Sequence, residues 1–297
     1  EPGMFRWCAG VAVLLVLIAV GNAQTSYGIR PIHIKGRIVR PCDYLLEKWN
    51  SFSRVVMYGL VRDDPQYWGP SPYAPRDSVL QYRMDIDGEA GTTMRRFGSA
   101  ADIEHLRYDV TNVGYALGRE GKACIVGVGG GRDVQAAVLF GHDSIVGIDV
   151  NPVFIDLLQG EFLEFAGIGG RDGVSLVVDD ARSWLSRSTD SFAVIQMALV
   201  DTWAATAAGA YSLSENALYT VEAWDIMLRR LADNGVFMVS RWHHPESIGE
   251  SGRLLSLAVA ALHRRGVADP SAHLAMIGSD RISTLLVGRE PFSADDV

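Results

Sequence analysis

The chain has 297 residues, of which 48% are hydrophobic and 21% charged, and its formal net charge is -8. This length and composition are those of a globular protein with one large domain or two smaller ones. The negative charge argues against nucleic acid as a partner, because neutralising phosphates requires a basic surface. The charge is unevenly distributed, since residues 1–60 hold seven Lys and Arg against three Asp and Glu.

The amino-terminal region contains an uncharged apolar segment, WCAGVAVLLVLIAVGNA, at residues 7–23. As a helix it would be about 25 Å long, the lower limit for crossing a bilayer. A signal peptide would use Arg6 as its positive end and the small residues before Gln24 as its cleavage site. A membrane helix would be followed by the basic segment 30–40, which the positive-inside rule keeps in the cytoplasm.

A buried helix of a soluble protein is the third interpretation of this segment. We favour the membrane helix, because dense positive charge directly after a signal sequence hinders export. We therefore assign residues 1–27 as a membrane helix or tether. The expected location is the inner (cytoplasmic) membrane, with the catalytic domain in the cytosol.

Residues 28–98 are predicted to form a small β domain. The segments HIKGRIV (33–39), RVVMYGLV (54–61) and QYRMDID (81–87) are typical of strands. The loop at 63–77 is too rich in proline and other turn residues to be a helix. We expect this domain to pack on the one that follows.

Residues 99–297 change to an alternation of strands and helices, starting with a predicted amphipathic helix at 99–117. We predict strands at 123–128, 144–149, 174–178, 192–199 and 235–240, helices near 134–140, 152–164, 181–187, 217–231 and 251–265, and a final hairpin within 272–288. This alternation predicts an α/β fold whose mostly parallel sheet is covered on both faces and ends in an antiparallel edge strand. Ligands of such sheets bind beyond the carboxyl ends of the strands.

A glycine-rich turn and an acidic residue mark the candidate ligand site. Gly127, Gly129 and Gly131 directly follow an apolar strand, and Asp149 ends the next strand, 20 residues beyond Gly129. Glycine lets the backbone turn tightly and lets a ligand lie against it. A carboxylate at the end of the second strand can accept the hydroxyl protons of a ribose. The combination predicts a nucleoside-containing ligand.

The glycine spacing indicates which nucleoside binds. The dinucleotide pattern G-x-G-x-x-G would require a third glycine where the chain has Arg132. The observed G-x-G-x-G suits a ligand without a pyrophosphate, namely S-adenosylmethionine or a relative. Asp180, after the third strand, could accept a hydrogen bond from the adenine amino group, or it could cap the following helix. Both interpretations remain open.

With these motifs the sequence resembles the spermidine synthase (polyamine aminopropyltransferase) family, which is built on the Rossmann-like class I methyltransferase fold. It is most similar to bacterial members whose synthase-like domain follows membrane helices. The resemblance covers about residues 40–290. It is carried by the motifs GVGGGRD, GIDVNP, VVDDARSWL and VIQMALVDTW…SENALYTVEAW.

The resemblance implies a role for each residue of the candidate site. The three glycines would line S-adenosylmethionine or its decarboxylated form, Asp149 would hold the ribose and Asp180 the adenine. Asp201, in the loop after the fourth strand, would face an amine or polyamine substrate as the catalytic residue. Further candidates for substrate binding are Tyr108, Trp203, Tyr211 and Glu215. We expect no metal, because the adjacent histidines of RWHHPE (241–246) would point in opposite directions on a strand.

Two positions depart from the family pattern. Ala198 stands where the family has the first Asp of its D-S-S-D-P loop, and Arg132 occupies the slot of an Asp near the aminopropyl amine. A guanidinium would repel that amine but could pair with the carboxylate of intact S-adenosylmethionine. We favour a spermidine synthase-like aminopropyltransferase. A methyltransferase and a non-catalytic nucleoside- or polyamine-binding domain of a membrane protein stay as alternatives, and a homodimer is left open.

Overall fold

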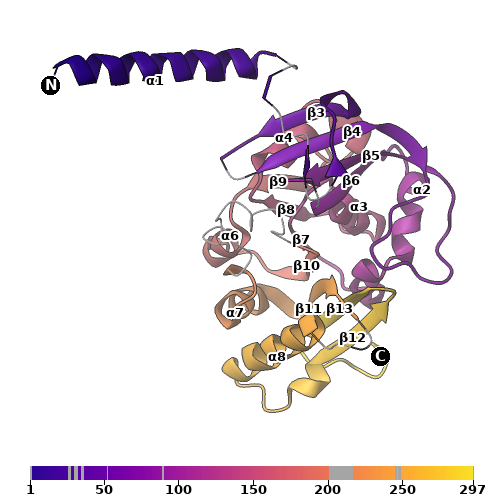
Figure 1. The fold of residues 1–297 in the computed structure, drawn as a ribbon. Helices are drawn as coiled ribbons and strands as arrows, with labels where there is room; N and C mark the ends of the chain where they lie inside the picture. The colour runs from indigo at the N-terminus through magenta and orange to yellow at the C-terminus, as the bar shows by residue number, and fades with distance from the viewer. Residues whose placement is uncertain are drawn as a thin grey trace.

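The computed structural model describes residues 2–25, 28–29, 33–34, 37–51, 53–88, 90–200, 217–244, 246 and 249–296. Within these residues, a single helix precedes a body built from a small antiparallel sheet and a larger mixed sheet (Figure 1).

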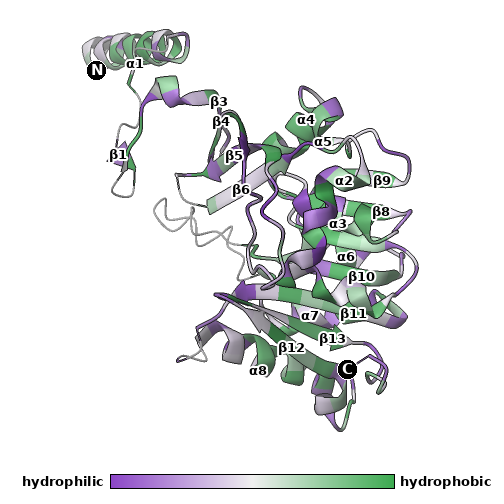
Figure 2. Cartoon of the chain, turned by 90° about the vertical axis from the view of Figure 1, so that its right-hand side faces the viewer, coloured by the Kyte–Doolittle hydropathy of each residue, from purple (hydrophilic) through white to green (hydrophobic). Residues whose placement is uncertain are grey.

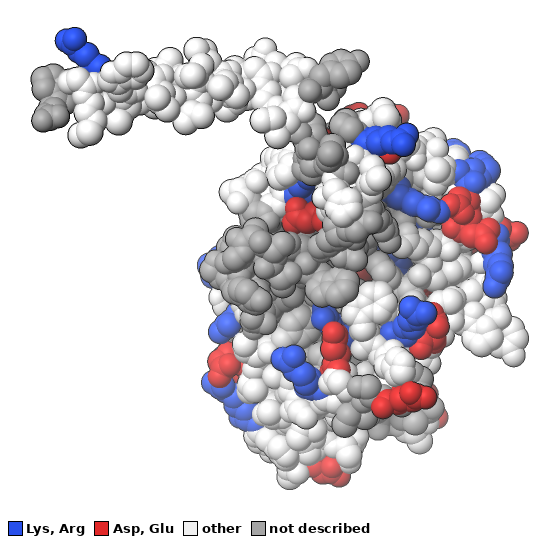
Figure 3. All heavy atoms as spheres, in the orientation of Figure 1, with Lys and Arg blue, Asp and Glu red and all other residues white. Residues whose placement is uncertain are grey.

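The first helix, α1 (Pro2–Ala23), extends away from the body (Figure 1). Its segment Gly3–Ala23 is long and apolar enough to cross a membrane, with a mean hydropathy of 2.2. Hydrophobic residues occur along its whole length (Figure 2). Its sequence contains one charged residue, Arg6, and Figure 3 shows one basic side chain near the free end of the helix. No part of this segment is buried against the rest of the chain, so the interpretation as a buried soluble helix is wrong.

The small sheet is antiparallel and has the order β3-β4-β5-β6. Its strands are β3 (Tyr44–Trp49), β4 (Arg54–Asp63), β5 (Val79–Ile86) and β6 (Ala90–Arg95), while β1 (His33–Ile34) and β2 (Arg37–Ile38) form a separate hairpin and η1 (Pro41–Asp43) leads into β3. The sequence predicts β4 and β5 but misses β3 and β6. YLLEKW lacks the strict alternation of a strand and AGTTMR has little apolar surface, so neither gives a period-two signal.

The large sheet has seven strands in the order β12-β13-β11-β10-β7-β8-β9. They are β7 (Ala123–Val126), β8 (Ile145–Asp149), β9 (Val174–Val178), β10 (Phe192–Ala198), β11 (Leu231–Trp242), β12 (Leu274–Ser279) and β13 (Ile282–Gly288), with η7 (Pro270–His273) before β12. Only β13 runs against the others, since β11 and β12 both pair with it in antiparallel register. The predicted α/β class and mostly parallel sheet are confirmed.

Helices cover both faces of this sheet, and Figure 2 shows them on its two sides. One apolar core lies under α3 (Arg132–Leu139), α4 (Pro152–Gln159) and α5 (Leu163–Ala166), and the other lies under α6 (Ala181–Arg187), α7 (Val221–Arg229) and α8 (Gly249–Arg264). The first core also contains Met57, Met84 and Met94 of the small sheet. The small sheet therefore packs into the core of the larger one, beside α3.

The predicted helix at 99–117 is broken into three pieces, so this expectation is wrong as a continuous element. The pieces are α2 (Ala100–Ile103), η2 (Glu104–Tyr108) and η3 (Val110–Leu117). Asp109 has extended backbone angles, and its side chain accepts the amide proton of Thr111 to start η3. The predicted helix at 152–164 is likewise divided, into α4 and α5, at the non-helical Gly160.

Candidate functional site

The predicted glycine turn joins β7 to α3 at the carboxyl edge of the large sheet. Gly127 and Gly131 have φ angles of 83° and 90°, which favour glycine over any residue with a side chain. Gly130, which the motif analysis did not single out, has a different role. A Cβ there would lie 2.2 Å from the carbonyl oxygen of Thr93, so the missing side chain lets β6 lie directly against the turn.

Asp149 ends β8 beside this turn. Its Oδ2 accepts a hydrogen bond from the Gly129 amide at 2.8 Å, and its Oδ1 accepts one from the Asn151 amide at 2.8 Å. The side chain is only 8% exposed, and burial raises its pKa although the amide donors act in the opposite direction. The structure thus brings together the glycine turn and the predicted ribose-binding acid. Contact with a ribose stays a prediction.

The small sheet covers this site from one side. Thr92 of β6 accepts a hydrogen bond from the Gly130 amide at 3.2 Å. Asn151 accepts a bond from Asn50 at 2.8 Å and donates one to Ser53 at 3.0 Å. Neither Thr92 nor Asn151 was predicted. The Asn-Pro pair that starts α4 is a recognisable capping signal, whereas the position of Thr92 depends on packing between distant segments.

Asp180 is the N-cap residue of α6. Its carboxylate accepts a hydrogen bond from the Ser183 amide at 2.8 Å, and the neighbouring Asp179 pairs with Arg187. The capping interpretation is confirmed. The second interpretation of Asp180, a hydrogen bond with the adenine amino group, stays a prediction.

Arg132 is buried, with 5% of its surface exposed. Its guanidinium pairs with Asp109 at 2.7 Å and Asp133 at 2.8 Å, and it donates a hydrogen bond to Thr111 at 2.9 Å. Burial alone would raise the pKa of Asp109, but Arg132 and the amides of Trp68 and Thr111 lower it below its usual value. Burial raises the pKa of Asp133. The guanidinium is therefore not directed to solvent, and its pairing with a ligand carboxylate stays a prediction.

The end of β10 lies against the glycine turn. Leu199, just after Ala198, has a φ of 50°, a strained value for leucine that is often found near functional sites. A Cβ on Gly127 would lie 2.8 Å from the side chain of Val200, and the Val200 carbonyl accepts a hydrogen bond from Arg241 at 2.9 Å. Val200 thus lies directly beside the glycine turn.

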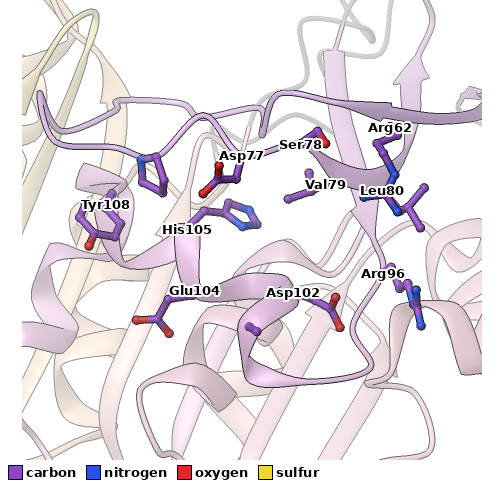
Figure 4. A pocket seen from close by; sticks show the side chains of 12 residues that line it. Arg62, Asp77, Ser78, Val79, Leu80, Arg96, Asp102, Glu104, His105 and Tyr108 are labelled. Carbon is purple, nitrogen blue, oxygen red and sulfur yellow. The ribbon is translucent and has the colours of Figure 1, made fainter.

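Four predicted residues, Asp201, Trp203, Tyr211 and Glu215, lie outside the described residues. Their roles remain predictions. Tyr108 is described and is 37% exposed. It lines a cavity that contains none of the glycine turn, Asp149 or Asp180 (Figure 4).

The histidines of the RWHHPE segment do not form a metal centre with other described residues. His243 shares a hydrogen bond with Ser251 at 3.0 Å. Among the residues that the structure describes, no group of three or more His, Cys, Asp and Glu side chains is arranged to hold a metal ion.

Comparison with known proteins gives matches between structures but none between sequences. The sequence matches no protein-family model and no curated protein. The structure is similar to that of a spermidine synthase in complex with the transition-state analogue AdoDATO, with a TM-score of 0.54 and 14% identity over 86% of this chain and 76% of that one. It is also similar to the spermidine synthase of Thermotoga maritima (TM-score 0.52, 14% identity, 86% of this chain and 75% of that one).

A third similar structure is a probable spermidine synthase from Corynebacterium glutamicum, with a TM-score of 0.54 and 15% identity over 84% of this chain and 82% of that one. At these identities the likeness defines the fold. The chain has the spermidine synthase-like fold, a Rossmann-like class I methyltransferase sheet, as the sequence motifs predicted.

Proposed function

We propose that the chain is a spermidine synthase-like transferase. It binds decarboxylated S-adenosylmethionine, or S-adenosylmethionine itself, and transfers an aminopropyl group to a small amine or polyamine. The observation that carries this proposal is the contact between the Gly129 amide and the Asp149 carboxylate, at the carboxyl edge of a sheet shared with spermidine synthases.

The Asp149 carboxylate retains capacity for a ligand. An ionised carboxylate offers about four lone-pair sites. The amides of Gly129 and Asn151 each donate one hydrogen bond to it, which leaves about two sites for ribose hydroxyls. Because these donors are backbone groups, they hold the carboxylate in place before a ligand arrives.

The transfer itself places modest demands on the protein. A sulfonium centre loses a neutral thioether, so the leaving group needs no acid. The site must align the attacking amine with the carbon–sulfur bond and keep that amine unprotonated. Asp201, which follows Val200 directly, is the candidate to accept the amine proton or to bind an ammonium group of the substrate.

Methyl transfer is the second candidate. Ala198 at the end of β10 offers no carboxylate where the resemblance expects a proton acceptor. The same glycine turn and Asp149 would serve intact S-adenosylmethionine equally well.

The apolar α1 supports a further part of the proposal, in which a membrane helix tethers the enzyme to the cytoplasmic membrane with its body in the cytosol.

Product analysis of the full chain tests the proposal. Putrescine or spermidine would be incubated with decarboxylated S-adenosylmethionine, and separately with S-adenosylmethionine, and the products identified by mass spectrometry. We expect an aminopropylated amine together with methylthioadenosine. A methylated amine would instead support the second candidate, and binding without any product would identify a non-catalytic domain.

The substitution Asp201→Asn tests the assigned catalytic residue in the same assay. It should lower turnover far more than cofactor affinity, whereas the exposed Asp172→Asn should change neither. Equal losses of turnover and affinity would show that Asp201 shapes the cofactor site instead.

A further inference from the structure

The small sheet contacts the candidate nucleoside site at two separate points. At the first, the hydroxyl of Thr92 in β6 accepts a hydrogen bond from the Gly130 amide at 3.2 Å. At the second, the connection between β3 and β4 contacts Asn151, two residues after Asp149. The small sheet is therefore in contact with both loops that form the candidate site, the loop after β7 and the loop after β8.

The second point is a closed ring of side-chain hydrogen bonds. Asn50 donates to Asn151 Oδ1 at 2.8 Å, and Asn151 donates to the Ser53 hydroxyl at 3.0 Å. The Ser53 hydroxyl in turn donates to Asn50 Oδ1 at 3.1 Å. Asn151 is 3% exposed and Ser53 9% exposed, while Asn50 is half-buried. Because the ring is largely shielded from water, breaking one of its bonds leaves a buried polar atom without a partner, which is costly.

Backbone amides determine the orientation of both asparagine side chains. The Ser53 amide can only donate, so it holds the oxygen of Asn50 on its side, at 2.8 Å. The Val153 amide likewise holds the oxygen of Asn151 at 3.2 Å, where Asn151 caps α4. Each NH2 group is then left facing an acceptor of the ring. Donors and acceptors therefore match around the whole ring.

The backbone of Asn151 connects this ring to the acid. Its amide donates to Asp149 Oδ1 at 2.8 Å, while the Gly129 amide donates to Oδ2 at 2.8 Å. With the bond from Gly130 to Thr92, hydrogen-bonded groups extend from β6 through the glycine turn and Asp149 to the connection between β3 and β4. A displacement of Asn151 would move one of the two amide donors that hold the Asp149 carboxylate.

We propose that Asn50 is a positioning residue for the nucleoside, acting through Asn151 on the Asp149 carboxylate. A binding group keeps its geometry only when neighbouring residues hold it in place. Asn50 is 101 residues from Asn151 along the chain, so the packing of the small sheet brings it to the site. The small sheet is thus part of the nucleoside site as well as its cover. This role rests on the proposed function, because it concerns a bound nucleoside.

The isosteric substitution Asn50→Asp tests this role. It keeps an oxygen for the Ser53 amide but places a second acceptor against Asn151 Oδ1, where the parent chain has a donor. Asn234→Asp is the matched control, since it makes the same change of charge at an exposed position near the start of β11. Calorimetry of the full chains would use methylthioadenosine, which has the ribose but no charge. We expect about tenfold weaker binding in Asn50→Asp and unchanged binding in Asn234→Asp.

Amide hydrogen exchange of the same chains, without ligand, gives an independent measurement. In Asn50→Asp the peptide that contains residues 149–153 should exchange faster than in the parent chain. Peptides from β10 and β13 should exchange at the parent rate, because they lie outside the hydrogen-bonded ring. A general loss of stability would instead accelerate exchange in all three peptides.

Two results would overturn the proposal. One is equal affinity for methylthioadenosine in the parent chain and in Asn50→Asp. The other is faster exchange in β10 and β13 as well as in 149–153, which would show that Asn50 supports only the overall fold. A parent chain that binds no nucleoside would refute the proposed function instead. The exchange of 149–153 would then decide alone, with a selective increase supporting the positioning of Asp149 and an unchanged rate refuting it.

Discussion

At the scale of single residues, the candidate nucleoside site depends on Asp149. Backbone amides hold the carboxylate against the glycine turn, and burial makes its charge costly unless donors surround it. A ribose hydroxyl would supply one more donor to this buried charge. The ligand and the carboxylate therefore stabilise each other.

Replacing the acid removes this acceptor. Asp149→Ala should abolish nucleoside binding, a loss of at least a hundredfold, because charged hydrogen bonds contribute about 1.5–3 kcal/mol each and two hydroxyls are held. Calorimetry would measure the affinity and circular dichroism the fold. A variant that keeps the parent affinity would remove Asp149 from the ribose-binding role.

Nucleoside affinity should also depend on pH through the same group. The pKa of Asp149 is raised above 3.8, mainly by burial, so on acidification it becomes protonated before an exposed Asp does. Only the ionised form accepts both hydroxyl protons, and affinity should therefore fall as the pH decreases through this raised pKa. The pH profile of Asp149→Asn should lack this decrease; an identical decrease in that variant would assign it to another group.

Sequence spacing was enough to select Asp149, Asp180 and the glycines as candidates, because Asp149 ends a strand and the others lie just after one. The sequence could not show whether the Arg132 side chain faces solvent or forms a buried ion pair, because its partner Asp109 is distant along the chain. The contact of Thr92 with the glycine turn had no local signal for the same reason.

At the scale of elements, Asp109 connects three segments. It accepts bonds from the Trp68 and Thr111 amides at 2.7 and 3.1 Å and pairs with Arg132 at the start of α3. The loop before β5, the start of η3 and the glycine turn are therefore held by one carboxylate. This residue also explains why the predicted helix at 99–117 is divided.

Breaking this buried pair should destabilise the fold. Asp109→Asn should lower the free energy of unfolding by about 3 kcal/mol, because the buried Arg132 guanidinium then keeps only Asp133 as an ion-pair partner. Since the pKa of Asp109 is lowered, its contribution is present at neutral pH and is lost only as the pH falls below 3.8. Urea denaturation would measure the effect. Asp63→Asn, at an exposed pair with Arg83, should cost less than about 1 kcal/mol, and equal losses would contradict the account.

At the scale of the whole molecule, α1 stands apart from a body that has its own two cores. The mostly parallel sheet with its antiparallel edge could be predicted from the alternation of strands and helices. The association of the small sheet with α3 could not, because its core residues such as Met57 and Met94 show no pattern that names their partner.

The membrane assignment predicts that the full chain stays with the membrane fraction after alkaline extraction. Leu15→Arg should reduce this retention, because a charge near the centre of a membrane helix costs about 2.5–3.5 kcal/mol. Quantitative immunoblotting of pellet and supernatant would measure it. A mature chain that begins at Gln24 would instead show that the segment is a cleaved signal peptide.

The most direct test of the central claim is calorimetric binding of the full chain to four ligands: decarboxylated S-adenosylmethionine, S-adenosylmethionine, methylthioadenosine and NAD. A glycine turn without the dinucleotide spacing, next to Asp149, should bind the sulfur-containing nucleosides and not NAD, with the decarboxylated form bound most tightly. Binding of NAD alone would contradict the assignment of both the ligand and the enzyme class.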